Sequence, residues 1–387
     1  MTSLNINKIK ITLYNQRGIS LIELMVGLTI GLIILTALLL LFSNISYSNK
    51  EQFKAAQQLE NGRYAMELLS NDIRLAGFYG EFASLPAAMS ALPDPCDETL
   101  YPEGDVTSTT TTSPLAFYLQ TYVASTLAAT PTIPTKCSSW IDNASLALGS
   151  DIIIVRRLNT SSLISPPDIL TATAASGQAY TQTNPSLLNI QYGTGSSINT
   201  TMNARGELIT DDSFKRKDFS QPVDVSSSLR PKISASIRSL VVHIYYVAKC
   251  RTGTGTNGKC RSTDDNIPTL KAIELSNFGS SPAMSVTPLV EGIEFLKIRL
   301  GIDTNKDGQM EGDLVKQPAN IEEWQDIVQV EIRLLARNSE KSLENDTKSY
   351  DLGGGLTFVP SGTERPYKRH AYSQQVYITN IAGRREL

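Results

Sequence analysis

An apolar run near the amino terminus extends from Leu24 to Phe42 and contains no charged residue. Apart from Thr29 and Thr36, it consists of Leu, Ile, Val, Met, Gly, Ala and Phe. Its length is close to the roughly 20 residues with which a helix crosses the hydrocarbon core of a bilayer. The pattern therefore predicts one membrane-spanning helix at this end of the chain.

The apolar pattern after this run changes to one apolar residue in every three or four. Seven residues carry it: Phe53, Ala56, Leu59, Met66, Leu69, Ile73 and Ala76. Such a stripe predicts that the helix continues and packs one face on other structure. Gly77 is a candidate carboxy-terminal cap, so we expect a helix over about 19–76, with Gly62 as a candidate bend.

Later parts of the chain carry strand-like patterns. Six runs have the composition of strands: 151–158, 240–249, 270–275, 292–302, 327–336 and 375–381. In the fifth run, aliphatic residues alternate with Gln329, Glu331 and Arg333. This alternation predicts a sheet with one wet face and one face buried against the long helix.

Two segments between these elements, 82–135 and 160–235, are rich in Pro, Thr, Ser, Asn and Gly. Such compositions disfavour helix formation and are typical of loops. The predicted fold class is therefore α+β. It consists of a long amino-terminal helix, first transmembrane and then amphipathic, packed on an antiparallel β-sheet head with large loop insertions.

Charges around the apolar run indicate its orientation. Glu23 stands at its start, where burying an ionised carboxylate in lipid costs at least about 2.5 kcal/mol, and the run contains no cation to pair with it. Lys8, Lys10 and Arg17 precede it without an acidic residue, which keeps the amino end cytoplasmic. Gly18 lies before the apolar run, so cleavage there retains the helix, unlike cleavage of a secretory signal peptide.

The stretch from Gly18 to Glu23 resembles the leader motif of type IV prepilins. That motif has a basic leader ending in Gly, an aromatic or aliphatic residue, Ser or Thr, Leu, an aliphatic residue and then Glu. The chain has Ile19 where Phe is commoner. The resemblance implies that a prepilin peptidase cleaves after Gly18 and that the new amine of Ile19 is methylated.

The resemblance also implies an organisation in four parts. These are a leader peptide (1–18), a transmembrane and filament-core helix (19–42), an amphipathic continuation of that helix (43–80) and a β-rich periplasmic or extracellular head (81–387). The chain is then a single-pass inner-membrane protein with a periplasmic head, which later joins a pilus at the cell surface.

After cleavage, Glu23 has a natural partner in the cationic amine of Ile19. A carboxylate and an amine about 4 Å apart attract far more strongly in a low-dielectric interior than in water. Because a rigid helix does not fold its own terminus back easily, we expect the amine of a neighbouring subunit to be the partner. The alternative is that Glu23 pairs with its own terminus or extends to the membrane interface.

A second run, Met66–Gly80, narrows the resemblance to the PilW family of minor pilins, with an Arg, then Ala-Gly, an aromatic pair and Gly. Weaker similarity occurs in Glu294–Arg299 and Asp326–Arg337. The resemblance implies a non-enzymatic minor pilin that helps to initiate a type IV pilus in a tip or priming complex. Its implied partners are other minor pilins, the major pilin, the prepilin peptidase, the assembly platform, the membrane and a tip adhesin.

Two other functions stay open. The leader and helix are shared with minor pseudopilins of type II secretion systems, and a membrane-anchored adhesin or binding module fits if the loop insertions form a surface. The net charge of −3 and pI near 5.6 give no general attraction to nucleic acid. We expect the basic clusters Lys368–His370 and Arg384–Arg385 to be solvated surface.

The four cysteines suit an oxidising compartment and allow three pairings. We expect disulfides between Cys96 and Cys137 and between Cys250 and Cys260, because each pair brackets a loop-rich stretch. The rival is a metal site, which is disfavoured because the chain has no C-x-x-C motif and only two histidines.

The apparent catalytic motifs lack the sequence context that their chemistry needs. Gly253–Gly258 matches G-x-G-x-x-G, but a phosphate site needs a helix directly afterwards, and a polar stretch ending at Pro268 follows instead. We expect a disulfide-closed hairpin tip there. His243 and His370 lie far apart in the sequence, and a shared histidine site is not expected.

One acidic segment after the fourth strand-like run has the spacing of a calcium loop. The candidate ligands are Asp303, Asn305, Asp307, Gln309 through its backbone carbonyl, Glu311 and Asp313. Gly308 stands in sixth place, where the loop turns, but Leu314 occupies the twelfth place of an EF-hand, which requires Glu. The segment is therefore either a calcium-stabilised β-loop or a plain Asp/Asn/Gly turn. No other cofactor is expected.

Overall fold

The computed structural model describes residues 18, 20–82, 84–101, 104–105, 112–161, 178–183, 188–192, 215–216, 233–234, 237–275 and 284–385. Ile19, the leader residues before Gly18 and most of the 160–235 insertion lie outside the described residues. The chain divides into two compact units, 1–53 and 54–387.

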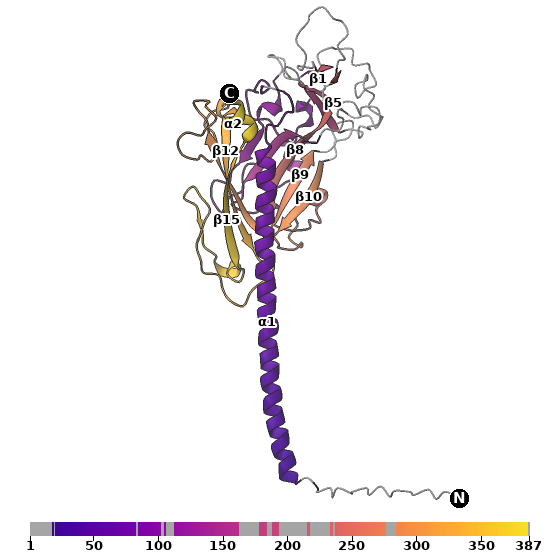
Figure 1. The fold of residues 1–387 in the computed structure, drawn as a ribbon, viewed down its shortest axis with the longest axis vertical. Coiled ribbons are helices and arrows are strands. Elements are labelled where there is room, and N and C mark those ends of the chain that lie inside the picture. Colours follow the sequence, from indigo (N-terminus) through magenta and orange to yellow (C-terminus); the bar gives the residue numbers. More distant parts are fainter. Residues whose placement is uncertain are drawn as a thin grey trace, which may run out of the picture. The chain divides into compact units, whose positions relative to one another are not determined.

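A single long helix, α1 (Leu21–Arg74), confirms the predicted amino-terminal helix to within two residues at each end (Figure 1). It ends where the chain reaches Gly77, which has a φ of 70°. This left-handed conformation is strained for residues with a Cβ and common for glycine just after a helix. The N–H of Gly77 donates to the carbonyl of Arg156 at 3.1 Å, so the turn is also tied to the sheet.

Gly62 has a packing role, and α1 continues through it without interruption. A Cβ at this position would lie 2.2 Å from Cε2 of the Tyr372 ring. The Tyr372 hydroxyl donates to the carbonyl of Leu59, one turn earlier in α1, at 3.1 Å. The glycine therefore lets an aromatic ring lie directly on the helix backbone.

The larger sheet has eight strands, paired in the order β1-β5-β4-β8-β3-β2, with β9 also paired to β8 and β10 paired to β9. The strands are β1 (Gly104–Asp105), β2 (Leu119–Tyr122), β3 (Ile152–Leu158), β4 (Ala179–Thr183), β5 (Leu188–Tyr192), β8 (Ile237–Ala248), β9 (Thr269–Leu275) and β10 (Met284–Glu291). All pairs are antiparallel. The 12-residue β8 organises the sheet, because it pairs with β3, β4 and β9.

The smaller sheet has the order β11-β12-β15, again antiparallel. Its strands are β11 (Ile293–Ile302), β12 (Ile327–Arg337) and β15 (Arg369–Tyr377). Two further antiparallel pairs are formed by β13 (Tyr350–Asp351) with β14 (Thr357–Phe358) and by β6 (Lys215–Arg216) with β7 (Ile233–Ser234). The short helices are η1 (Glu98–Leu100), η2 (Pro114–Ala116), η3 (Lys136–Ser139), η5 (Thr256–Gly258), η6 (Glu322–Gln325), η7 (Gly362–Glu364) and α2 (Thr379–Arg385). These elements confirm the α+β fold.

Five of the six predicted strands form, as β3, β8, β9, β11 and β12. The sixth prediction, 375–381, is wrong in its second half, because β15 ends at Tyr377 and α2 begins at Thr379. The sequence did not indicate β10, which contains Pro288. The strand tolerates this proline because it lies at the edge of its sheet, next to a β-bulge.

The prediction of one wet face on β12 is wrong at its first half. Gln329 and Glu331 are only 3% and 5% exposed. Glu331 accepts from Arg333 at 3.0 Å and from Arg299 at 3.4 Å, so the buried polar face is held together by charge. Loops after β11 cover it, since a Cβ on Gly301 would lie 2.9 Å from the sulfur of Met310.

The two sheets are tied by a buried ion pair. Nζ of Lys297 in β11 lies 2.5 Å from Oδ1 of Asp151, which directly precedes β3. The same carboxylate accepts from the backbone N–H groups of Ala124 and Ile298, each at 2.9 Å. Burial raises the pKa of Asp151. With three donors directed at this carboxylate, the contact ties β11 to the start of β3.

Candidate functional site

The amino-terminal site consists of Gly18, Ile19 and Glu23. Gly18 is exposed, and Ile19 lies outside the described residues. Oε2 of Glu23 accepts a hydrogen bond from the backbone N–H of Ser20 at 3.0 Å, at the first turn of α1. The Ser-x-x-Glu spacing is that of a capping box, a signal that the sequence contained and our prediction missed. The geometry holds the carboxylate beside the predicted cleavage point.

The first part of α1 exposes its apolar side chains. Every residue from Leu21 to Ile45 is exposed, including Phe42 at 72%. Among the described residues, α1 is the helix that is long and apolar enough to cross a membrane. Exposing so much apolar surface to water is unfavourable, so this part of the helix needs lipid or protein around it.

The second part of α1 packs within the head. Its buried residues are Gln58, Gly62, Ala65, Met66, Leu69, Ser70, Asp72 and Ile73. Gln58 donates to the carbonyls of Ala336 at 2.7 Å and Lys368 at 3.0 Å, and Asn61 donates to the carbonyl of Glu291 at 3.0 Å. Side-chain amides thus bind strand ends, in addition to the apolar stripe.

Asp72 anchors this part of α1 to the larger sheet. Its Oδ1 accepts from Nε of Arg157 at 2.6 Å, while its Oδ2 accepts from the Tyr245 hydroxyl at 2.8 Å and lies 2.8 Å from Nδ1 of His243. Burial alone would raise the pKa of Asp72, but hydrogen bonds and positive charge from His243 and Arg157 outweigh it and lower the pKa to about 2. The spacing of Asp72, three residues after Leu69 on the buried stripe, was a signal for this role.

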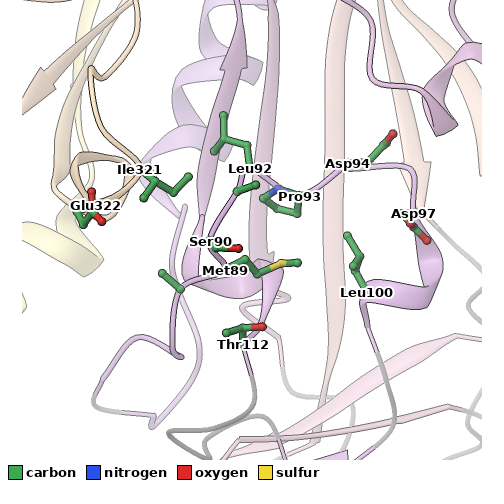
Figure 2. Close-up of a pocket in the computed structure, with 12 residues that line it drawn as sticks. Met89, Ser90, Leu92, Pro93, Asp94, Asp97, Leu100, Thr112, Ile321 and Glu322 are labelled. Atoms are coloured by element: carbon green, nitrogen blue, oxygen red, sulfur yellow. The ribbon is translucent and has the colours of Figure 1, made fainter.

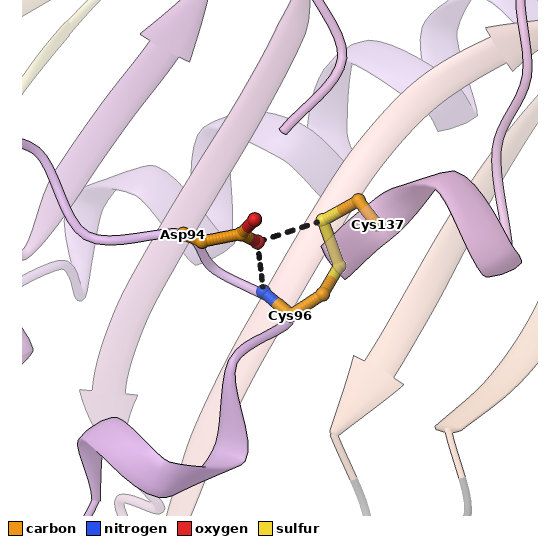
Figure 3. A group of neighbouring side chains, drawn as sticks. All are labelled: Asp94, Cys96 and Cys137. Atoms are coloured by element: carbon orange, nitrogen blue, oxygen red, sulfur yellow. Dashed lines mark hydrogen bonds between the residues drawn. A yellow bond between two sulfur atoms is a disulfide. The ribbon is translucent and has the colours of Figure 1, made fainter. Parts of the chain in front are cut away.

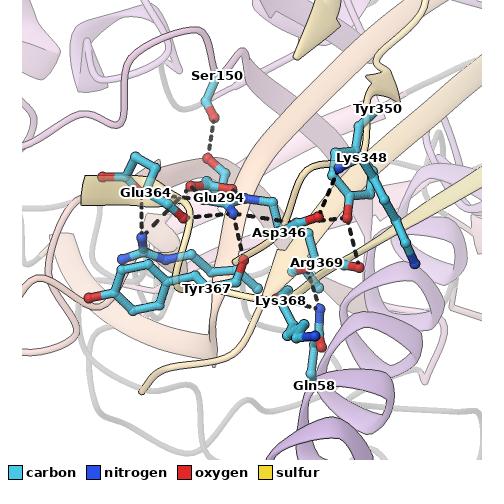
Figure 4. Close-up of polar contacts among 12 residues, drawn as sticks. Gln58, Ser150, Glu294, Asp346, Lys348, Tyr350, Glu364, Tyr367, Lys368 and Arg369 are labelled. Atoms are coloured by element: carbon cyan, nitrogen blue, oxygen red, sulfur yellow. Dashed lines mark hydrogen bonds and ion pairs between the residues drawn. The ribbon is translucent and has the colours of Figure 1, made fainter. Parts of the chain in front are cut away.

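A second buried network surrounds Arg369, at the start of β15 (Figure 4). Its guanidinium binds Glu294 through two hydrogen bonds of 2.6 and 3.0 Å and lies 3.6 Å from Asp346 and 3.3 Å from Glu364. The prediction that the Lys368–His370 cluster is solvated surface is wrong for Arg369, whose side chain is 0% exposed. The network fixes the long loop between β12 and β15.

The candidate calcium loop follows β11, as predicted. Oxygen atoms of Asp303, Asp307 and Glu311 lie within 4.8 Å of one another. Asp303 is buried and accepts backbone N–H groups of Lys306 (2.6 Å), Asp307 (3.2 Å) and Gly308 (3.0 Å).

The remaining candidate ligands belong to the same loop but take other places. The N–H of Asp307 binds the side-chain oxygen of Asn305 at 2.9 Å, and the N–H of Gln309 binds Asp307 at 2.9 Å. Asp313 lies outside the carboxylate group. The arrangement places three carboxylates close together, and hard oxygen donors are the ligands that calcium prefers.

Each predicted cysteine pair is joined by a disulfide, Cys96–Cys137 and Cys250–Cys260. Asp94 supports the first (Figure 3): it accepts the N–H of Cys96 at 3.0 Å and that of Lys136 at 2.7 Å, and the Cys137 sulfur lies 3.5 Å from it. Because both sulfurs are in the disulfide, this group offers no thiolate for a metal. The second disulfide closes the Gly253–Gly258 loop, which is followed by no α-helix.

A groove of about 530 Å³ is lined in part by Asp94, the residue that supports the first disulfide (Figure 2). It is lined by apolar side chains that include Met89, Leu92, Leu100 and Ile321, and Glu322 stands at its margin. The sequence gave no sign of this groove, because its walls come from loops far apart in the chain.

Two family models match the chain. Residues 13–39 match the prokaryotic N-terminal methylation motif, and residues 244–380 match type IV pilus-assembly protein W. No curated protein and no solved structure matches it. The Met66–Gly80 run, which resembled PilW sequences, lies outside both matched segments.

A methylation motif that leads into a long apolar helix, followed by a head of antiparallel sheets, defines a type IV pilin. The second match covers the end of β8, the β9–β10 pair and the whole smaller sheet. The two matches together support assignment of the chain to the PilW family of type IV pilins. Pilin-family domains are structural, and type IV pilus components interact with other pilus proteins.

Proposed function

We propose that the chain is a minor pilin that takes part in initiating a type IV pilus, in a priming or tip complex. The observation that carries this proposal is the first part of α1, which is apolar, exposed at every residue from Leu21 to Ile45 and interrupted by one acidic side chain, Glu23. A segment of this kind needs other molecules to bury it.

Processing precedes this role. A prepilin peptidase removes residues 1–18, and the new amine of Ile19 becomes methylated. Residues 19–42 then span the inner membrane, residues 43–80 continue the helix, and the head of residues 81–387 lies in the periplasm until the subunit reaches the cell surface. The methylation-motif match over residues 13–39 supports this order.

Glu23 sets the register of assembly by pairing with the Ile19 amine of a neighbouring subunit. The hydrogen bond from Ser20 occupies only one carboxylate oxygen, and an ionised carboxylate accepts several donors. The neighbours are other minor pilins and the major pilin, and the assembly platform and a tip adhesin are further partners.

Deletion of the gene tests this role. An initiating subunit sets how many filaments begin, so cells without it should carry at least tenfold fewer pili of ordinary length. Complementation with the intact gene should restore the number. Unchanged pilus number with lost export of secreted enzymes would instead identify a type II secretion pseudopilin. Unchanged pilus number with lost attachment to a surface would identify an adhesin.

We also propose that the loop of residues 303–313 binds calcium, supported by the carboxylates of Asp303, Asp307 and Glu311 that lie within 4.8 Å of one another. Millimolar calcium, compared with a chelator, should raise the unfolding temperature of the detergent-solubilised full chain. Asp307→Ala should abolish this shift, and Glu340→Ala, an exposed acid elsewhere, should keep it. No shift in the intact chain would leave a plain turn.

A further inference from the structure

The edge strands of the two sheets differ in how they are protected. On the smaller sheet, the outer edge of β11 is occupied by the chain itself: Asp151 donates its N–H to the carbonyl of Leu296 at 2.8 Å, and Leu300 and Val315 exchange two hydrogen bonds of 2.7 and 2.9 Å. On the larger sheet, β10 carries Pro288 and a β-bulge. Prolines and bulges are common devices that keep an edge from pairing with another strand.

The opposite edge of the smaller sheet, β15, has none of these devices. All nine of its residues pair with β12 in one unbroken register. From His370 to Tyr377 the sequence HAYSQQVY contains no proline, lysine, arginine or carboxylate. Natural proteins usually blunt such an edge with a charge or a proline, so the neutral composition calls for an explanation.

The direction of the free backbone groups follows from two hydrogen bonds at the ends of the ladder. Asn338 of the β12 side donates its N–H to the carbonyl of Lys368, and Ile378 donates its N–H to the carbonyl of Val328. In an antiparallel pair, residues that bond to the partner strand alternate with residues that point away. Even-numbered residues of β15 therefore bond to β12, and the backbone groups of Ala371, Ser373, Gln375 and Tyr377 point outward.

These four residues are accessible. Each is exposed, Tyr377 at 53%. Within the described part of the chain, no hydrogen bond joins their outward N–H or C=O groups. The edge therefore offers an alternating row of donors and acceptors, which matches an extended strand of roughly seven residues.

A positive charge near the outer edge of β15 favours an added strand from a different subunit over one from a second copy of this chain. Tyr372 of β15 lies on α1, and the cationic Arg63 is close enough to oppose the raising effect of burial on the pKa of Tyr372. Arg63 is exposed and has no ion pair among the described residues. A second copy of this chain would bring a second Arg63 to the interface, whereas a different subunit can supply a carboxylate.

We propose that the outer edge of β15 receives an extended strand from a different pilus subunit, with an acidic side chain directed at Arg63. The added strand extends the smaller sheet and hydrogen-bonds to Ala371, Ser373, Gln375 and Tyr377 through its backbone. This contact does not depend on the priming role, because any position in the pilus brings the chain against other subunits.

Proline at an outward position tests the contact. Ser373→Pro removes one outward N–H and leaves the bonds to β12 in place, and edge strands tolerate proline on this side. Ser373→Ala, which keeps the amide, is the matched control. Ser373→Lys is a second way to block the edge, since it adds a charge without constraining the backbone. The unfolding temperature of each full-length variant reports that the fold is intact.

Photo-crosslinking in pilus-producing cells provides the readout, with Tyr377 replaced by p-benzoylphenylalanine in the full chain. We expect an adduct with a segment of another pilus subunit, identified by mass spectrometry. Ser373→Pro and Ser373→Lys should lower its yield at least tenfold, Ser373→Ala should leave it unchanged, and the same probe at exposed Leu148 should not form it. The proposal is overturned by no adduct, by an adduct with a second copy of the chain alone, or by a yield that proline and lysine leave unchanged.

Discussion

The two parts of α1 share one backbone and differ in where their side chains find partners. From Leu21 to Ile45 every residue is exposed. From Gln58 to Ile73 the buried residues include Gln58, Gly62 and Asp72, each of which contacts other residues of the head. Burial of apolar surface is the dominant favourable term in folding and in association alike. The second part of α1 packs its apolar and polar side chains within the chain's own fold. The first part leaves its side chains exposed and available to other molecules.

Loss of the Glu23 carboxylate should break the first part of this comparison most severely. We expect Glu23→Ala to leave leader cleavage and head stability intact and to lower the amount of the subunit in sheared pili at least tenfold, because the neighbour's amine loses its partner in a low-dielectric interior. Immunoblots of pili and membranes measure both. Glu23→Gln, which keeps the shape and the hydrogen bond from Ser20, separates charge from capping. Normal incorporation of both variants would contradict the proposed pairing.

Removal of Asp72 should break the second part by destabilising the head. Asp72→Ala removes the counter-charge of Arg157, whose side chain is 15% exposed, so we expect a loss of about 3 kcal/mol, the lower end of the range for breaking a buried pair. Urea unfolding of the solubilised full chain measures the loss. Glu67→Ala, at an exposed position five residues earlier on the same helix, should change stability by less than about 0.5 kcal/mol. Equal effects of the two substitutions would show that the contacts of Asp72 contribute nothing.

Lowering the pH should test the same contribution of Asp72 to the stability of the head. The positive charge and hydrogen bonds from His243 and Arg157 lower the pKa of Asp72 from 3.8 to about 2 despite burial, with Tyr245 also bonded to the carboxylate and Glu274 nearby. Since the folded pKa lies below the unfolded one, the stabilisation is fully present above pH 4 and is lost as the pH falls toward 2. It amounts to about 2 kcal/mol. Asp72→Asn should remove this part of the acid sensitivity, which urea unfolding at pH 5 and pH 2.5 can measure.

Sequence patterns predicted what depends on neighbours along the chain. The length of α1, five strands and both disulfides follow from periodicity, β-branched runs and loop spacing. Partners distant in the sequence were not visible. Arg369 was expected on the surface because the sequence shows a basic cluster, and only the fold brings Glu294, some 75 residues away, against its guanidinium.

The polar face of β12 teaches a related lesson. Its alternation correctly separates two faces, but alternation reports polarity, and polar side chains can be buried when charges pair across strands, as Glu331 does with Arg299 and Arg333. The groove and the open edge of β15 are likewise products of tertiary packing. The capping box at Ser20 is different, because its signal was present in four consecutive residues.

Gly62 gives the smallest and most local test of the comparison. Gly62→Ala places a Cβ 2.2 Å from the Tyr372 ring, so the ring must move and its hydrogen bond to Leu59 is strained. Overpacking costs typically 1–3 kcal/mol, and alanine regains about 1 kcal/mol of helix propensity, so we expect a net loss of about 1 kcal/mol in urea unfolding. Gly27→Ala is the matched control in the exposed part of α1, where nothing lies within 4 Å of the added Cβ. If Gly27→Ala destabilised the head as much as Gly62→Ala, the two parts of the helix would not be separable in this way.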